Sequence, residues 1–167
     1  NRDMTKITYD KAKITDIDDV MHIEETSFPA DEVLSRASML ERIQVIPERF
    51  FVARNEEGKV VGILVGPTSD KCYLTDDMFE KTEASLPTDR FQIIVSLAVD
   101  SEYQGLGIAT SLLDLMKEAA AEESRQGISL TCVESLIPYY ERYGFVSKGI
   151  SDSQLAGETW YNMVLPL

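Results

Sequence analysis

Residues 91–120 read FQIIVSLAVDSEYQGLGIATSLLDLMKEAA. The apolar run FQIIVSLAV is typical of a buried strand, and the last part of the stretch places Ile108, Leu112 and Met116 on one face of a helix. Between them, Gly105 and Gly107 allow a tight turn with exposed backbone N–H groups, next to the positive end of the helix dipole. The stretch therefore predicts a strand, an anion-binding turn and a helix, in that order.

The ligand of this turn stays open when the turn is considered alone. A nucleotide-binding P-loop would end in Gly-Lys-Ser/Thr, but Ala109 and Thr110 stand there and the phosphate-binding lysine is missing. A dinucleotide fingerprint lacks its third glycine, and too few residues follow Thr110 to complete a doubly wound sheet. A strand-to-helix turn without any ligand is the remaining alternative.

The rest of the chain alternates between strand-like and helix-like segments. Strands are predicted at 5–13, 50–66 (a hairpin), 91–99, 127–134, 145–150 and 158–167. Helices are predicted at 16–28 with Thr15 as cap, at 32–45, in the long helix after the turn, and at 135–144 with Ser135 as cap, plus a short one near 74–81 in an irregular segment, 67–90. The order predicts a mixed α/β (α+β) fold: a mostly antiparallel central sheet of about six to seven strands flanked by about four helices.

Length and charge limit the classes of function. A chain of 167 residues is expected to form a single domain, 1–167. The net charge of −13 repels a phosphate backbone, so nucleic acid is excluded as a partner. No apolar run is long enough to cross a membrane, and the N-terminal residues do not resemble a signal peptide, so we expect no membrane partner and a cytoplasmic protein. The oligomeric state is left open.

Metal and imidazole chemistry are not expected. The two cysteines, Cys72 and Cys132, do not have metal-binding spacing, and His22 is the single histidine. A Ser-His-Asp or Cys-His site needs an imidazole base close to the nucleophile, and His22 lies in a helix-like segment far from any such motif.

Two motifs taken together suggest a ligand for the turn. In VSLAVDSEYQGLGIATSLL, Gln104, Gly107 and Ala109 match a Q/R-x-x-G-x-G/A pattern, and YYERYGF at 139–145 follows after the next predicted strand. In both motifs and in element order, the whole chain resembles the GCN5-related N-acetyltransferase (GNAT) superfamily. The runs IEETSF, LAVDSEYQGLG and LTCVESLIPYYERYGF are most similar to its serotonin (arylalkylamine) N-acetyltransferase branch.

The resemblance implies that the turn binds acetyl-CoA as co-substrate. Backbone groups of Leu97, Ala98 and Val99 would hydrogen-bond the pantetheine arm as an added strand does. The N–H groups of the turn would surround the pyrophosphate; they belong to Gln104, Gly105, Leu106, Gly107, Ile108, Ala109 and Thr110.

Tyr140 matches the tyrosine that faces the sulfur atom in the resembled family, which implies that it is the catalytic general acid. A phenol with a reference pKa near ~10 is protonated at neutral pH and can donate its proton to a thiolate. The alternative is a core residue, because Leu136, Tyr140 and Tyr143 share one helical face.

This chain differs from the resembled branch at the position of the general base. The two strand histidines of that branch correspond to Ile93 and Val95 here, and neither an isoleucine nor a valine can accept a proton. With Phe28, these two residues would form an apolar wall suited to an apolar amine. The proton of the amine would then leave through water molecules or to a carboxylate elsewhere. Glu134, at the end of the next strand, is one candidate base, and a solvated residue at a strand end is the alternative role for it.

The expected function is therefore transfer of the acetyl group of acetyl-CoA to a primary amine, a small (arylalkyl)amine, by direct attack. Two alternatives remain: an acetyltransferase of protein N-termini or lysines, and a catalytically silent acyl-CoA-binding module. Acceptor pockets in such folds are built from variable loops, so the sequence leaves the amine open.

Overall fold

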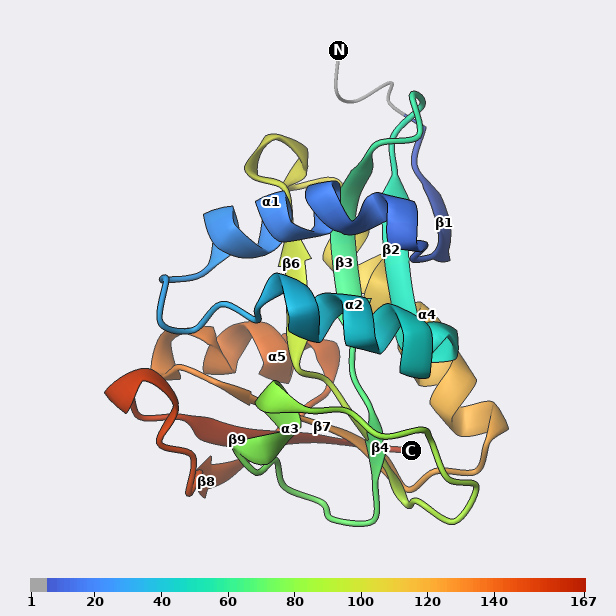
Figure 1. Cartoon of the computed structure of the whole chain (residues 1–167). Coiled ribbons are helices and arrows are strands. Elements are labelled where there is room, and N and C mark those ends of the chain that lie inside the picture. The colour runs from blue at the N-terminus through green and yellow to red at the C-terminus, as the bar shows by residue number, and fades with distance from the viewer. Residues whose placement is uncertain (1–5) are drawn as a thin grey trace.

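The computed structural model describes residues 6–167, which form nine strands and five α-helices (Figure 1). The predicted mixed α/β class is confirmed. In chain order the elements are β1 (Thr8–Lys11), α1 (Ile17–Ser27), α2 (Arg36–Val45), β2 (Phe50–Arg54), β3 (Val60–Val65), β4 (Thr68–Ser69), α3 (Asp77–Glu80), β5 (Phe91–Ile93), β6 (Ser96–Val99), α4 (Ile108–Glu122), β7 (Gly127–Cys132), α5 (Ile137–Tyr143), β8 (Val146–Ile150) and β9 (Tyr161–Pro166).

The strands form two sheets, where the sequence predicted one central sheet. The first has the order β1-β2-β3-β6 and is antiparallel throughout. The second has the order β4-β5-β7-β9-β8 and is antiparallel except for the parallel pair β5–β7. Mostly antiparallel pairing is therefore confirmed.

The predicted strand at 91–99 is where the two sheets separate. The N–H of Ile94 donates to the carbonyl of Ser129 in the second sheet at 2.9 Å, whereas the N–H of Val95 donates to the carbonyl of Val65 in the first, also at 2.9 Å. One apolar run thus supplies β5 to one sheet and β6 to the other. Gly66 permits the close approach, since a Cβ there would lie 1.8 Å from the carbonyl oxygen of Ile93.

Helices cover both faces of the first sheet (Figure 1). Helices α1 and α2 pack on one face, with Ile23, Met39 and Ile63 fully buried between them. Helix α4 packs on the other face through Leu112 and Met116, and this second core continues under α5 and the second sheet. Full burial of one such aliphatic side chain stabilises the fold by roughly 1.5–3 kcal/mol.

Three helix starts and the first strand differ from prediction. Helices α1 and α5 each follow a short 3-10 turn, at Ile14–Asp16 and Glu134–Leu136, so Thr15 and Ser135 lie inside those turns and are not caps. Helix α2 begins later than predicted because Ser35 caps it, its Oγ accepting from the N–H of Ser38 at 3.1 Å. The first strand spans Thr8–Lys11; residue 5, where it was predicted to begin, lies outside the described residues.

Residues 6–167 contain neither a candidate membrane span nor a candidate metal cluster. None of the helices described there is long and apolar enough to cross a membrane. In the same residues, no group of three or more His, Cys, Asp or Glu side chains could hold a metal ion.

Candidate active site

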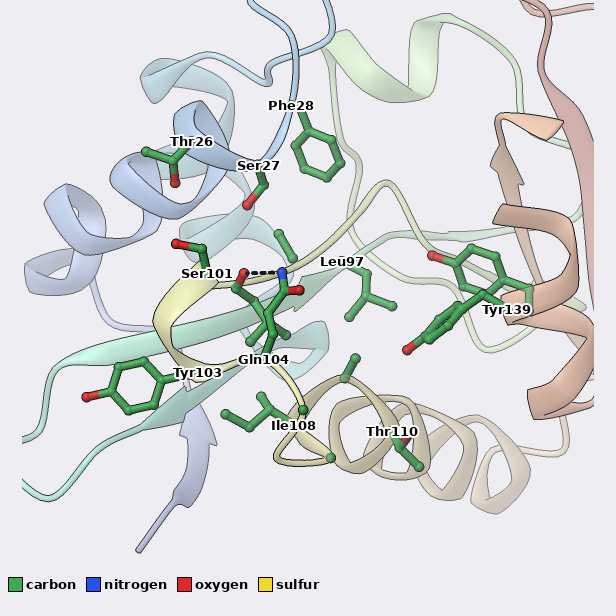
Figure 2. Close-up of a pocket in the computed structure, with 16 residues that line it drawn as sticks. Thr26, Ser27, Phe28, Leu97, Ser101, Tyr103, Gln104, Ile108, Thr110 and Tyr139 are labelled. Carbon is green, nitrogen blue, oxygen red and sulfur yellow. Dashed lines mark hydrogen bonds between the residues drawn. The ribbon is translucent and has the colours of Figure 1, made fainter. Parts of the chain in front are cut away.

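A cleft of about 630 Å³, here called the cleft, lies between β6, the turn at 104–107, the start of α4 and helix α5. Figure 2 shows Phe28 from the end of α1 toward the top of the view and Tyr139 from α5 toward the right. All of the predicted cofactor-binding residues line the cleft except Leu106, whose side chain packs against the core beneath α4. The lining residues from that prediction are Leu97, Ala98, Val99, Gln104, Gly105, Gly107, Ile108, Ala109 and Thr110.

The turn presents backbone N–H groups to the cleft. Gly105 and Gly107 have φ of +79° and +77°, a conformation that favours glycine, and a Cβ at either position would meet no atom within 4 Å. No side chain caps α4, and no acidic residue lies in its first turn. Within the described residues, the N–H groups of 105–107 make no backbone hydrogen bond outside the helices, and those of Ile108 to Thr110 lie in the first turn of α4, so the turn fits an anion such as a pyrophosphate.

Strand β6 is the edge of the first sheet at the cleft. Leu97 and Ala98 pair with Leu64 and Ile63 of β3, and no other described strand pairs with β6. Its second backbone edge can therefore accept an extended ligand as an added strand. The side chain of Gln104 folds back over the end of β6 and donates to the carbonyl of Val99 at 3.5 Å (Figure 2).

A second cavity of about 410 Å³, here called the inner pocket, adjoins the cleft. Ser27, Phe28, Leu97 and Tyr140 line both cavities, so they mark the point where the two meet. Apolar side chains make most of the wall of the inner pocket; they include Phe79, Ile94, Val95, Leu130, Leu136, Leu155 and Trp160.

The inner pocket carries negative charge only. Its lining includes Glu24, Glu32 and Glu158 and contains no lysine, arginine or histidine. Burial, together with the nearby Asp31 and Glu158, raises the pKa of Glu32 above its ordinary value. The inner pocket therefore favours a ligand with a cationic or neutral head group over an anionic ligand.

The three residues of the predicted apolar wall do not lie together. Phe28 and Val95 line the inner pocket, but Ile93 is fully buried and lines neither cavity. Strand β5 ends at Ile93, the chain passes to the first sheet between Ile94 and Val95, and Ile94 lines the inner pocket in place of Ile93. Glu134, the candidate base, lies exposed on the 3-10 turn before α5 and lines neither cavity.

Glu24 is the carboxylate that the sequence reasoning missed. Its side chain is only 1% exposed, and it accepts hydrogen bonds from Ser96 Oγ at 2.6 Å and from the N–H of Leu34 at 3.0 Å. Burial raises the pKa of Glu24, while these two hydrogen bonds and the charge of Arg42 oppose the rise. The signal was its place in the buried stripe of α1, where an apolar residue is expected.

Tyr140 is also buried where the cavities meet. Its ring makes edge-on contacts with Tyr139 and Phe145, at centroid distances of 5.1 and 5.5 Å. Within the described residues, its hydroxyl forms no hydrogen bond. Burial, with smaller contributions from Tyr139 and Cys132, raises the pKa of Tyr140 well above its usual range, so the phenol is protonated at neutral pH.

The sequence profile of the acetyltransferase (GNAT) domain family matches residues 47–147, which include β6, the turn, α4 and α5. This chain belongs to that family. The GNAT chain is thereby assigned to the acyl-CoA-dependent acetyltransferases, and the superfamily resemblance of the sequence is confirmed. No curated protein matches the GNAT chain in sequence.

Solved structures share the fold of the GNAT chain. Ard1 from Thermoplasma volcanium has a TM-score of 0.77 at 22% identity, over 96% of this chain and 97% of that chain. The loading GNATL domain of CurA from Lyngbya majuscula has a TM-score of 0.82 at 13% identity, with 96% and 98% covered. The NatC complex bound to Gag peptide and CoA has a TM-score of 0.75 at 20% identity, with 97% and 99% covered. These likenesses show the GNAT fold and do not identify a substrate.

Proposed function

We propose that residues 1–167 act as one GNAT domain that transfers the acetyl group of acetyl-CoA directly to a small primary amine. In this proposal the cleft holds acetyl-CoA and the inner pocket holds the amine. The observation that carries it is the shared boundary of the two cavities, where a buried phenol, Tyr140, lies beside a pocket that contains a buried carboxylate, Glu24.

The cleft suits acetyl-CoA by its backbone groups. The N–H groups of Gln104 to Thr110 would hold the pyrophosphate, helped by the dipole of α4. The unpaired edge of β6, at Leu97 to Val99, would hydrogen-bond the pantetheine arm. Several solved structures with this fold contain CoA or isobutyryl-CoA, which supports the same ligand here.

Glu24 and Tyr140 would divide the proton transfers. A primary amine arrives protonated, so Glu24 would take its proton, directly or through a water molecule, before the nitrogen attacks the thioester carbonyl carbon. As the carbon–sulfur bond breaks, Tyr140 would give its proton to the sulfur and recover one from the attacking nitrogen through solvent. The raised pKa of Glu24 brings its basicity closer to neutral pH, where a general base works best.

An acyl-enzyme on Cys132 is not part of the proposal. This cysteine lines the inner pocket, but burial raises its pKa to about 11, so its thiol is protonated at neutral pH and is a poor nucleophile. Direct attack by the amine fits this lining better.

The inner pocket favours an arylalkylamine. Phe28, Phe79 and Trp160 offer aromatic surface to an apolar body, and the carboxylates suit the amine. An amino acid or another acceptor with a carboxylate near the amine would meet three like charges.

The test is a thiol-release assay with acetyl-CoA against arylalkylamines, polyamines, amino acids, aminoglycosides and peptides with free N-termini. We expect turnover of arylalkylamines and an increase in melting temperature with acetyl-CoA. Turnover of peptides alone would assign the chain to protein acetylation. Binding of CoA with no turnover on any acceptor would indicate a silent acyl-CoA-binding module.

A further inference from the structure

Arg42 on α2 is a fully buried cation, with 0% of its surface exposed. Its guanidinium donates from Nη2 to the carbonyl of Met78 at 2.6 Å, and from Nη1 to the carbonyl of Ser38 at 3.2 Å and to Ser38 Oγ. Its Nε has no hydrogen-bond partner in the described part of the chain. In the same residues, no carboxylate lies within 4.0 Å of it.

Such a side chain is costly to the fold. Removing a guanidinium from water costs several kcal/mol, and neutral acceptors offset this only in part. Desolvation lowers the pKa of Arg42, opposed by the charges of Glu41 and Glu24. A methionine would fill similar space without this cost, so stability alone does not account for an arginine here.

The first contribution of Arg42 is to the wall of the inner pocket. Helix α3 has only four residues and contains Phe79, which lines that pocket. A helix of this length is not stable alone and depends on its contacts. The bond from Arg42 to the carbonyl of Met78 joins α3 to α2 at the residue before Phe79. Nearby, Glu41 accepts from the N–H of Thr82 at 2.9 Å.

The second contribution is charge at Glu24. Helix α1, which contains Glu24, packs on α2, β3, β6 and the 3-10 turn before it. Strands β3 and β6 have no ionisable side chain. The ionisable groups on the other packed elements and in the inner pocket are Asp16, Arg36, Glu41, Arg42, Glu32, Glu158, Cys132 and Tyr140.

Among these groups the cations are Arg36 and Arg42. Arg36 pairs with the exposed Asp18 at 2.7 Å, away from the pocket. Of the two, Arg42 is the cation that lowers the pKa of Glu24, after the larger effects of burial, which raises it, and of the hydrogen bonds from Leu34 and Ser96, which lower it. The Glu24 carboxylate therefore has one buried positive charge near it and no ion pair.

We propose that Arg42 is a positioning residue for acetyl transfer: it fixes Phe79 over the inner pocket and supplies a buried positive charge on α2, the helix that packs against the helix of Glu24. The proposal rests on the proposed function, and it adds a residue that touches neither acetyl-CoA nor amine. The hydrogen bond from Arg42 to the Met78 carbonyl is here called the clamp. Its effect can be separated from that of the charge, because a lysine would keep the charge while weakening the clamp.

The test uses Arg42→Gln, which removes the charge, and Arg42→Lys, which keeps it. The surface variant Arg36→Gln is the matched control from the same helix. The Glu24 carboxyl is titrated by carbon-13 NMR in protein labelled at glutamate, with the signal assigned from Glu24→Gln. We expect the midpoint of Glu24 to rise by about one pH unit in Arg42→Gln, with little change in Arg42→Lys and none in Arg36→Gln.

The clamp is measured by amide hydrogen exchange at residues 78–82. Exchange there should become at least several-fold faster in Arg42→Lys and Arg42→Gln, and stay unchanged in Arg36→Gln. In an active enzyme, the acid limb of kcat/KM should follow the NMR midpoint of Glu24.

An unchanged Glu24 midpoint in Arg42→Gln, or unchanged exchange at 78–82 in both Arg42 variants, overturns the proposal. Neither NMR titration nor exchange requires turnover, so a failure of the proposed function is seen separately, as wild-type protein that acetylates no amine. If Arg42→Gln does not fold, hydrogen exchange in Arg42→Lys still tests the clamp. The effect of the charge is then tested by titrating Glu24 in Arg42→Met.

Discussion

The cleft and the inner pocket lie next to each other but are built in different ways. Backbone groups of one stretch, 97–110, form most of the cleft's proposed binding surface. The inner pocket is formed by side chains from distant parts of the chain: α1, α3, the β5–β6 junction, β7, α5 and the segment 155–160. A contiguous backbone site appears in the sequence as a motif, whereas a site assembled from distant side chains does not. A substitution in one cavity should therefore leave the function of the other unchanged.

The largest effect is expected from Glu24→Gln, which removes the proposed base of the inner pocket. Loss of a general base typically costs about 10²–10⁴-fold in rate, so kcat/KM for the amine should fall by that order while the Kd for acetyl-CoA stays constant. Steady-state kinetics and calorimetry measure the two. Glu25→Gln, on the exposed face of the same helix, is the control. Equal activity in both variants would remove Glu24 from the mechanism.

Tyr140→Phe should lower kcat by about 10²-fold, because it removes the proton offered to the sulfur and leaves the ring in place. The matched control is Tyr143→Phe on the same helix, whose hydroxyl instead donates to Asp114 on α4 at 2.6 Å. We expect Tyr143→Phe to keep its rate. Near wild-type turnover in Tyr140→Phe would identify Tyr140 as a core residue, the alternative that its helical face left open.

A substitution in the turn of the cleft should weaken the binding of acetyl-CoA without changing the reaction with the amine. Gly107→Ala forces an L residue to φ of +77°, which costs about 1 kcal/mol and shifts the free N–H groups. The Kd for acetyl-CoA should rise about fivefold, and the KM for the amine should not change. Gly149→Ala is the control, because φ there is +90° with nothing within 4 Å of its Cβ, but Gly149 lies on β8 outside both cavities. Equal effects on acetyl-CoA binding would contradict a specific role for the turn.

The reaction with the amine and the binding of acetyl-CoA should differ in their dependence on pH. The raised pKa of Glu24 means that kcat/KM rises with pH as its carboxyl loses a proton, at a higher pH than an ordinary glutamate would give. Binding of acetyl-CoA through backbone N–H groups should not show that limb. A pH series of kcat/KM for the amine and of Kd for acetyl-CoA checks both, and a shared limb would argue against this division.

The smallest effect concerns a pair outside both cavities. Arg54 donates twice to Asp16 at 2.8 Å. Burial favours a higher pKa for Asp16, but the bonds from Arg54 and from the N–H of Lys13 lower it overall. Its stabilisation is therefore present above the unfolded pKa near 3.8 and is lost as pH falls through the lower folded value. Asp16→Asn should lower the free energy of unfolding by about 1–3 kcal/mol at pH 7, less at pH 3, with unchanged kinetics; urea unfolding measures this.

The sequence was sufficient for local features. Gly105, Gly107 and the apolar stripe of α4 predicted a strand, a turn and a helix, and the structure contains all three. The change of sheet between Ile94 and Val95 was not visible, because FQIIVSLAV has no charge or turn residue at that point. As a result Ile93 lies buried in the core and does not line the inner pocket.

The acceptor side depended on tertiary structure. Phe79 and Trp160 lie in or next to irregular segments, which give no periodic signal, and only folding brings them to the same pocket. Glu24 did leave a signal, a carboxylate within the buried stripe of α1, but a single such residue does not reveal that Ser96 and the N–H of Leu34 meet it.

The junction at Ile94 and Val95 has a mechanical consequence. Adjacent residues are each hydrogen-bonded to a different sheet, and their Cα atoms are only ~3.8 Å apart. The two sheets therefore cannot slide apart at this point without breaking a backbone hydrogen bond. Under the proposed function, the thioester of acetyl-CoA lies along the first sheet, and both sheets contribute residues to the inner pocket. A single peptide unit therefore fixes the distance between the sites of acetyl-CoA and the amine.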